Sequence, residues 1–247
     1  MTTDFAPLDW FSLAVFLLIF FGYGYIARLL TGGGNLNSVL HQVRRSWMQR
    51  MMDRPDRIVD SALTGHTVAS ISFFSSATIL VIAGLLGLLG KTTDAYRVIS
   101  SWFFVTPSST DAFQLKLVGL IAIFVYGFFR FTWALRQYNY CCALIGAAPL
   151  AKDEHPHRGE MADQVAIVYS SALASFGAGI RCYYFALAWL AWLSSAIAFL
   201  AAIILVLLVL LRRQAISHSV RAIRRYMELN PPDDDTGNDR GNDRGNN

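Results

Sequence analysis

The chain has 247 residues, of which 54% are hydrophobic and 15% are charged, and its formal net charge is +4. Soluble domains carry about 25% charged residues, so this composition excludes an ordinary soluble domain. Acidic residues are also absent from long stretches, notably 112–152 and 164–227. Because lipid cannot hydrate a carboxylate, we predict an all-α polytopic membrane helix bundle with four clear spans and a fifth short one.

The first two predicted spans are residues 8–27 and 67–90. Trp10 lies at the start of the first, and Tyr23 and Tyr25 lie near its end, where aromatic residues favour the membrane interface. The second span carries no charge and has glycines at every third position, 84, 87 and 90. Such small residues favour close packing of helices in lipid, with a pore-lining role as the alternative.

Residues 91–111 are expected to form a loop, with Trp102, Phe103 and Phe104 at the interface. The Pro-Ser-Ser-Thr-Asp sequence at 107–111 is typical of a helix start, and the third span follows at 113–135. Lys116 is interpreted as a residue that extends its amine to the headgroups.

The last apolar stretches are 164–180, which is rich in Ser, Ala and Gly, and 186–211. Arg181 separates them and is expected to anchor an outer turn. Whether 164–180 crosses the membrane decides the span count. The alternative is a re-entrant or interfacial segment.

Lysine and arginine counts predict the topology. None precedes Leu8, five lie at 44–57, and seven follow Leu211. Positive residues favour the cytoplasmic side, so we expect an outside N-terminus and a cytoplasmic C-terminus. This arrangement requires an odd number of crossings and favours 164–180 as the fifth. The cations therefore orient spans, and nucleic-acid binding is not expected.

Two segments, 36–51 and 216–227, have the pattern of basic amphipathic helices, which can lie in the membrane interface. Their arginines are expected to contact anionic lipid headgroups on the cytoplasmic side. These are Arg44, Arg45, Arg50, Arg221, Arg224 and Arg225.

Residues 1–229 are expected to form a single membrane-embedded helical domain. The Gly-Asn-Asp-Arg repeats make 230–247 a disordered polar tail.

Arg130 and Arg136 are the other candidate contacts for an anion or a lipid phosphate. Arg130 is expected about 7 Å inside the inner edge of the third span. At about 100° per residue, the two side chains leave the helix roughly 120° apart. Either Arg130 extends to the headgroups or it lines a polar interior; we predict that it faces the interior and Arg136 the interface.

Motifs for an enzyme are missing from the sequence. It contains no HExxH, GxSxG or P-loop pattern. The three cysteines lack metal-ligand spacing, and His155 and His157 belong to a short polar linker. We expect a protein that is not an enzyme and needs neither a cofactor nor a metal.

The stretch from Phe128 to Tyr140, ending Arg-Gln-Tyr-Asn-Tyr, is followed by Leu-Ile-Gly-Ala-Ala-Pro at 144–149. These residues resemble a bacterial membrane-protein family known only as domain of unknown function family 599. The resemblance covers most of residues 8–228. It implies an uncharacterised integral membrane protein and supplies no activity or functional residues.

Two functional hypotheses remain open. One is a small transport or channel-type subunit that handles an anion or a lipid-like solute. The other is a non-catalytic scaffold that binds anionic lipid or a partner protein through its basic cytoplasmic face. A water-filled cavity that reaches Arg130 favours the first, and a bundle filled with side chains favours the second. A homo-oligomer is compatible with either.

Overall fold

The computed structural model describes residues 5–31, 36–101, 109–215 and 218–230, which are helical or irregular and contain no strand. The predicted tail beyond residue 230 and the aromatic residues 102–104 lie outside these ranges. The helices are α1 (Pro7–Thr31), α2 (Leu36–Met52), α3 (Ile58–Gly90), α4 (Thr92–Ser100), α5 (Thr110–Ala147), α6 (Arg158–Leu190), the 3₁₀ turn η1 (Ala191–Leu193), α7 (Ala196–Ala215) and α8 (His218–Leu229).

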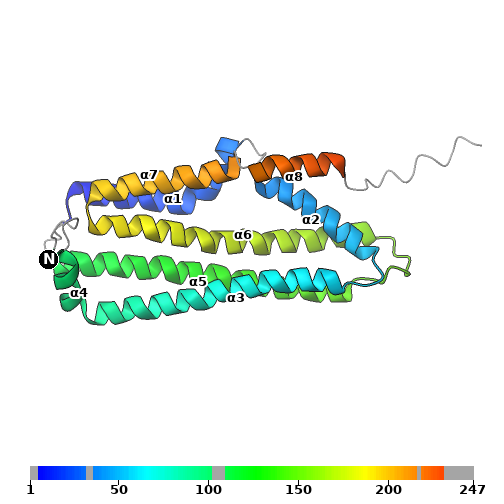
Figure 1. The fold of residues 1–247 in the computed structure, drawn as a ribbon, viewed down its shortest axis with the longest axis horizontal. Helices are drawn as coiled ribbons and strands as arrows, with labels where there is room; N and C mark the ends of the chain where they lie inside the picture. Colours follow the sequence, from blue (N-terminus) through cyan, green and yellow to red (C-terminus); the bar gives the residue numbers. More distant parts are fainter. Residues whose placement is uncertain (1–4, 32–35, 102–108, 216–217, 231–247) are drawn as a thin grey trace, which may run out of the picture.

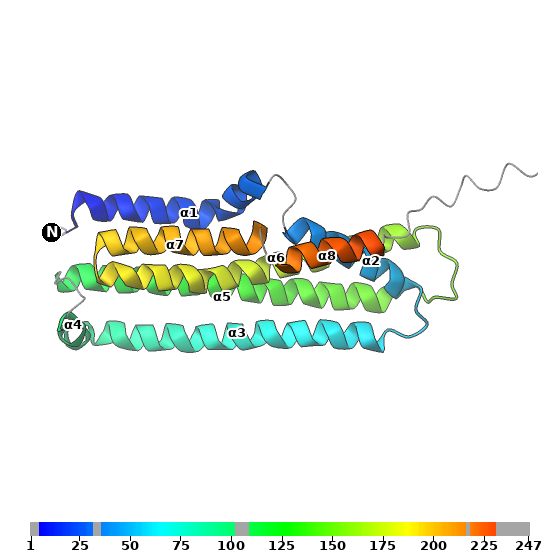
Figure 2. The same ribbon diagram turned by 45° about the horizontal axis from the view of Figure 1, so that its top comes forward.

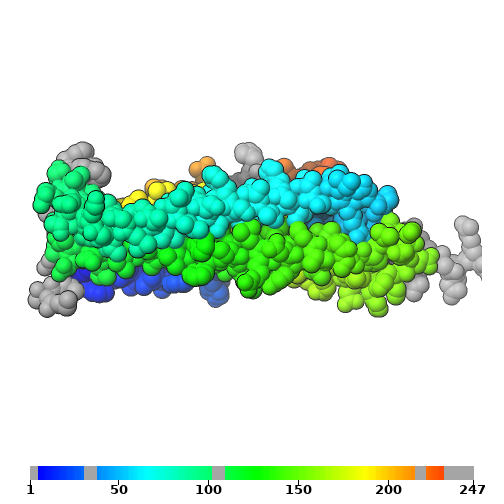
Figure 3. Space-filling model, turned by 90° about the horizontal axis from the view of Figure 1, so that it is seen from below, coloured from blue at the N-terminus to red at the C-terminus, as the bar shows by residue number. Residues whose placement is uncertain are grey.

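Three long helices, α3, α5 and α6, run side by side along the whole molecule (Figure 1). The shorter α1 and α7 lie along one half of them, and α2 and α8 lie along the other half (Figure 2). The space-filling view shows α3 lying along α5 for most of its length (Figure 3). We name the two ends of the bundle the α4 end and the α2/α8 end.

The long helices exceed the thickness of a bilayer. α5 has 38 residues, about 57 Å at 1.5 Å per residue, whereas the hydrocarbon core is about 30 Å thick. The 20 residues of α7 match that thickness. The half of the bundle with α1 and α7 therefore fits the membrane, and the half with α2 and α8 extends beyond it.

In the part of the chain that the structure describes, five helices are long and apolar enough to cross a membrane: α1, α3, α5, α6 and α7. The predicted count of five is confirmed, and the architecture is that of a multi-pass membrane protein. An odd number of spans also explains why the start of α1 and α8 lie toward opposite ends of the bundle (Figure 1).

The predicted boundary at Arg181 is wrong. α6 continues through this residue to Leu190, and the chain turns at 191–195. The Arg181 guanidinium lies 4.9 Å from the centre of the Tyr23 ring, so the helix accommodates the charge without ending. The turn forms where Ser195 caps α7, its hydroxyl accepting a hydrogen bond from the Ala198 amide at 3.1 Å.

The predicted loop at 91–111 contains a helix. α4 lies across the bundle axis, and Figure 2 views it end-on. It therefore has the orientation expected of an interfacial helix. The predicted helix start is confirmed, because α5 begins at Thr110 and the Ser109 hydroxyl accepts a hydrogen bond from the Ala112 amide at 3.2 Å.

α2 lies alongside the long helices, not across them. Met48, Met51 and Met52 on its apolar face are fully buried in a cluster with α5 and α6, so protein covers the face that was expected to enter lipid. A buried carboxylate holds the end of α2. Asp60 Oδ1, in the first turn of α3, accepts hydrogen bonds from Trp47 Nε1 and Arg54 Nη1, each at 2.6 Å.

Small residues bring α5 and α6 together. A Cβ atom at Gly119 would lie 2.1 Å from Trp189, and one at Gly179 would lie 2.4 Å from Phe131. The glycines that the sequence marked for packing behave differently, because nothing lies within 4 Å of a Cβ built at positions 84, 87 or 90. The prediction that these three glycines pack closely against another helix is therefore wrong for the described part of the chain.

Replacing Gly119 should therefore destabilise the bundle. We expect Gly119→Ala to cost about 1–3 kcal/mol, because the methyl group overlaps the Trp189 ring, which is itself packed in the core. Gly87→Ala is the matched control, since its methyl group meets open space and alanine favours a helix. Thermal unfolding of the purified protein in detergent measures both. Equal melting temperatures for the two variants would contradict the packing described here.

Candidate functional site

Two arginines of neighbouring helices lie at the same level of the bundle. The antiparallel register of α5 and α6 is set by Gly127, which approaches Cys182, and by Phe131, which covers Gly179. Arg130 and Arg181 are therefore neighbours across the interface, and their guanidinium groups repel each other. The sequence indicated Arg130 but missed Arg181, because the helix was expected to end there.

Within the described part of the chain, no acidic partner neutralises either arginine. Both side chains are partly buried, and the Arg130 Nε atom is buried without a hydrogen-bond partner. Among the described residues, neither Arg130 nor Arg181 forms an ion pair or donates a hydrogen bond. The nearest favourable contact of Arg181 is the face of Tyr23, a residue that was expected at the interface and is instead buried. Two unneutralised cations at one level favour an anion.

The pair lies within two helical turns of the arginine in the last turn of α1. Tyr23, beneath Arg181, is five residues before Arg28, a rise of about 8 Å along α1. Arg28 and Arg213 are in the last turns of α1 and α7, and Arg213 donates to the Tyr184 hydroxyl at 2.5 Å. A headgroup on the α2/α8 side can therefore reach the pair.

Arg136 differs from Arg130 in exposure. It lies about 9 Å further along α5, and its side chain is exposed. Arg130 is therefore the more buried of the two, and its facing the bundle interior stays a prediction. Arg136 is therefore a useful control, because it carries the same charge as Arg130 on an exposed side chain.

The arginines of α2 make contacts inside the protein. Arg44 donates to the Ser170 hydroxyl at 3.2 Å, and Arg45 pairs with Asp163 at 2.6 Å. Arg50 donates to the side-chain oxygen of Asn230 at 2.6 Å. Burial lowers the pKa of Arg44, and nearby tyrosines oppose this shift. These three residues therefore hold α2 to α6 and to the end of α8.

The arginines of α8 lie on its surface. Arg221, Arg224 and Arg225 are exposed, and Arg225 pairs with Glu228 at 2.9 Å within the helix. They form a basic face at the α2/α8 end. This face is suited to contact with an anionic surface, but its exposed arginines do not enclose a binding site for a single anion.

Lys116 does not extend to the headgroups as expected. Its side chain is 8% exposed, and its Nζ atom donates to the Trp192 carbonyl oxygen at 2.9 Å. The carbonyl is available because η1 interrupts the regular helical hydrogen bonds at this point. Lys116 therefore holds the turn between α6 and α7 against α5.

Arg57 and Arg158 order the loop that follows α5. Arg57 donates to the carbonyl oxygens of Ile145 and Ala148 at 3.1 and 2.9 Å, which satisfies groups left free at the end of the helix. Arg158 donates to the carbonyl oxygen of Asp153 at 3.1 Å. The described part of this loop holds no cluster of metal ligands, although it contains His155 and His157.

Comparison with known proteins gives a family without an assigned role. No curated protein and no solved structure matches the chain. One family model does match, over residues 11–219, which include all five candidate membrane-spanning helices in whole or in large part. The chain therefore belongs to the family described as a protein of unknown function, DUF599.

Proposed function

We propose that this protein is a non-catalytic component of the bacterial cytoplasmic membrane that binds anionic lipid headgroups on its cytoplasmic side. The observation that carries the proposal is the pair formed by Arg130 and Arg181, two partly buried cations with no acidic partner among the residues described. An uncompensated charge near hydrocarbon is costly, and a lipid phosphate offsets that cost with two charge-assisted hydrogen bonds.

The packing beside the pair favours lipid binding over transport. At the same level, Phe131 contacts Phe74 and Phe176, with ring centres 6.0 and 5.8 Å apart. Tyr183 joins this cluster and hydrogen-bonds Thr78 at 2.8 Å. Aromatic rings therefore fill the space between α3, α5 and α6. The alternative of a transport or channel subunit requires a passage that these side chains would have to vacate.

Removing the charge of the pair should release bound anionic lipid. The double variant Arg130→Gln with Arg181→Gln replaces the two guanidinium groups with shorter, neutral amides and loses two charges, each worth about 1 kcal/mol near an anionic surface. At about 1.4 kcal/mol per factor of ten, retention of phosphatidylglycerol should fall by about 30-fold. Mass analysis of lipid that co-purifies in mild detergent measures the change.

Arg136→Gln is the matched control, because it removes an exposed arginine from the same helix. We expect it to lower lipid retention only slightly. The proposal fails if the double variant inserts normally and retains as much phosphatidylglycerol as the unmodified protein. Binding of inorganic phosphate by the pair in the absence of lipid would favour the transport alternative.

The cytoplasmic assignment is tested separately by reporter fusions. The chain has no Lys or Arg before Leu8 and seven after Leu211, so we expect the N-terminus outside and the C-terminus in the cytoplasm. A periplasm-active enzyme fused before residue 7 and a cytoplasm-active fluorescent protein fused after residue 229 should both give signal. Fluorescence from an N-terminal fusion of the second reporter would reverse the orientation.

A further inference from the structure

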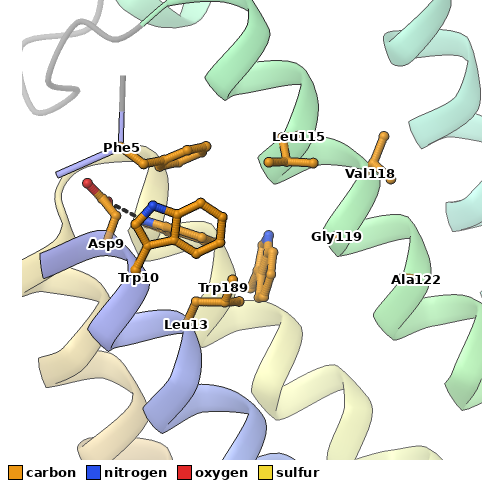
Figure 4. Close-up of a pocket in the computed structure, with 10 residues that line it drawn as sticks. Phe5, Asp9, Trp10, Leu13, Leu115, Val118, Gly119, Ala122 and Trp189 are labelled. Carbon is orange, nitrogen blue, oxygen red and sulfur yellow. Dashed lines mark hydrogen bonds between the residues drawn. The ribbon is translucent and has the colours of Figure 1, made fainter. Parts of the chain in front are cut away.

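An apolar pocket opens between two membrane-spanning helices near the α4 end. Residues of α1 and α5 line it together with Trp189 of α6 (Figure 4). Trp192 of η1 also belongs to the lining, and we call the two tryptophans the floor of the pocket. The volume is about 350 Å³. It lies nearer the α4 end than the arginine pair does, because Ala122, its last lining residue on α5, comes eight residues before Arg130, about 12 Å along the helix.

The polar groups of the pocket are already satisfied by the protein. Trp192 Nε1 donates to Asp9 Oδ1 at 2.7 Å, and Trp189 Nε1 donates to the Lys116 carbonyl oxygen at 2.7 Å. The other Asp9 oxygen accepts from the Ala6 amide at 3.1 Å. The walls therefore present carbon, and a water molecule, which needs two to four polar partners, gains little there.

The floor of the pocket is firmly held. Trp189 packs on Gly119 and on Phe16, whose ring centre lies 4.9 Å away. Trp192 stacks on Phe199, also at 4.9 Å between ring centres. By contrast, Trp10 is 51% exposed and stands at the open side. The pocket is thus a preformed recess and does not depend on mobile floor residues.

The volume and the direction of the pocket match those of one hydrocarbon chain. A dry cavity of about 150 Å³ admits benzene, so this pocket accommodates roughly a dozen carbon atoms. It extends along α5 from Leu115 to Ala122, about 10 Å in the direction that a lipid chain takes through the bilayer. A whole helix of a second protein, at least about 10 Å across, is too wide to enter it.

The charge at the rim selects the headgroup. Asp9 lies among the lining residues at the start of α1 and is only partly buried, so its carboxylate is accessible from outside the protein. The Lys116 ammonium also interacts with Asp9, but it is buried and held by the Trp192 carbonyl oxygen, so the carboxylate is the more exposed of the two charges. The carboxylate attracts an ammonium group and repels a net negative headgroup. We propose that this pocket binds one acyl chain of an amine-bearing zwitterionic lipid of the phosphatidylethanolamine class, with the ammonium beside Asp9. This site is independent of the proposed anionic-lipid site.

Quenching of tryptophan fluorescence tests the pocket. Three of the six tryptophans line it, so phosphatidylethanolamine with a brominated acyl chain should quench up to about half of the emission of the protein in nanodiscs. Ala122→Phe fills the pocket from an exposed position and should remove most of this quenching. Ala83→Phe, on an exposed face of α3 outside the pocket, should leave it unchanged.

Equal quenching of the unmodified protein and Ala122→Phe would overturn the acyl-chain site. Should Ala122→Phe unfold, Val118→Phe fills the same pocket from the next turn of α5 and gives the same test. Brominated phosphatidylglycerol should quench several-fold less at equal lipid content, and Asp9→Asn should abolish that difference. Equal quenching by both lipids in the unmodified protein would overturn the role of Asp9. Arg130→Gln with Arg181→Gln should not change any of these results.

Discussion

The close approach of α5 and α6 is the constraint on which the rest of the structure depends. Without a Cβ atom, Gly119 receives the Trp189 ring and Gly179 receives the Phe131 ring. In lipid, where apolar surface alone does not drive helices together, such fitted contacts supply much of the association energy. They also fix the register of α5 and α6. That register brings Arg130 to the level of Arg181 and forms the floor of the pocket near the α4 end.

The cations in or near the membrane differ in whether the protein itself supplies a partner for the charge. A charge near hydrocarbon needs a partner, and Lys116 obtains one from the Trp192 carbonyl oxygen at the turn between α6 and α7. Among the described residues, Arg130 and Arg181 donate no hydrogen bond to a carbonyl oxygen and pair with no carboxylate. Lys116 is therefore a structural cation, whereas Arg130 and Arg181 form a pair that is suited to an anion from outside the protein.

The half of the bundle beyond the membrane is built differently from the membrane half. There, ion pairs and polar contacts reinforce apolar packing, as in the Arg45–Asp163 pair and the buried Asp60 that receives Trp47. Arginines that looked available for lipid are used to attach α2. A basic amphipathic helix therefore does not by itself indicate a membrane-surface helix, because another helix can cover its apolar face as well as lipid can.

The sequence by itself determined the fold class, the number of spans and the start of α5. These depend on local properties: apolar length, the absence of acids, and a serine placed to cap a helix at residue 109. It also indicated that Arg130 is more enclosed than Arg136, because helical periodicity separates side chains six residues apart.

Only the tertiary structure decided which helices cover which faces. The end of α6 was misplaced because an arginine inside an apolar stretch resembles a boundary, whereas the ring of Tyr23, more than 150 residues away in sequence, makes the position tolerable. Glycines 84, 87 and 90 have the packing pattern but no neighbour among the described residues, and Gly119 and Gly179 have the neighbours without the pattern. Periodicity records which side of a helix a residue occupies. Which helix or lipid lies on that side depends on contacts between segments that are distant in sequence. A local sequence pattern contains no information about these contacts.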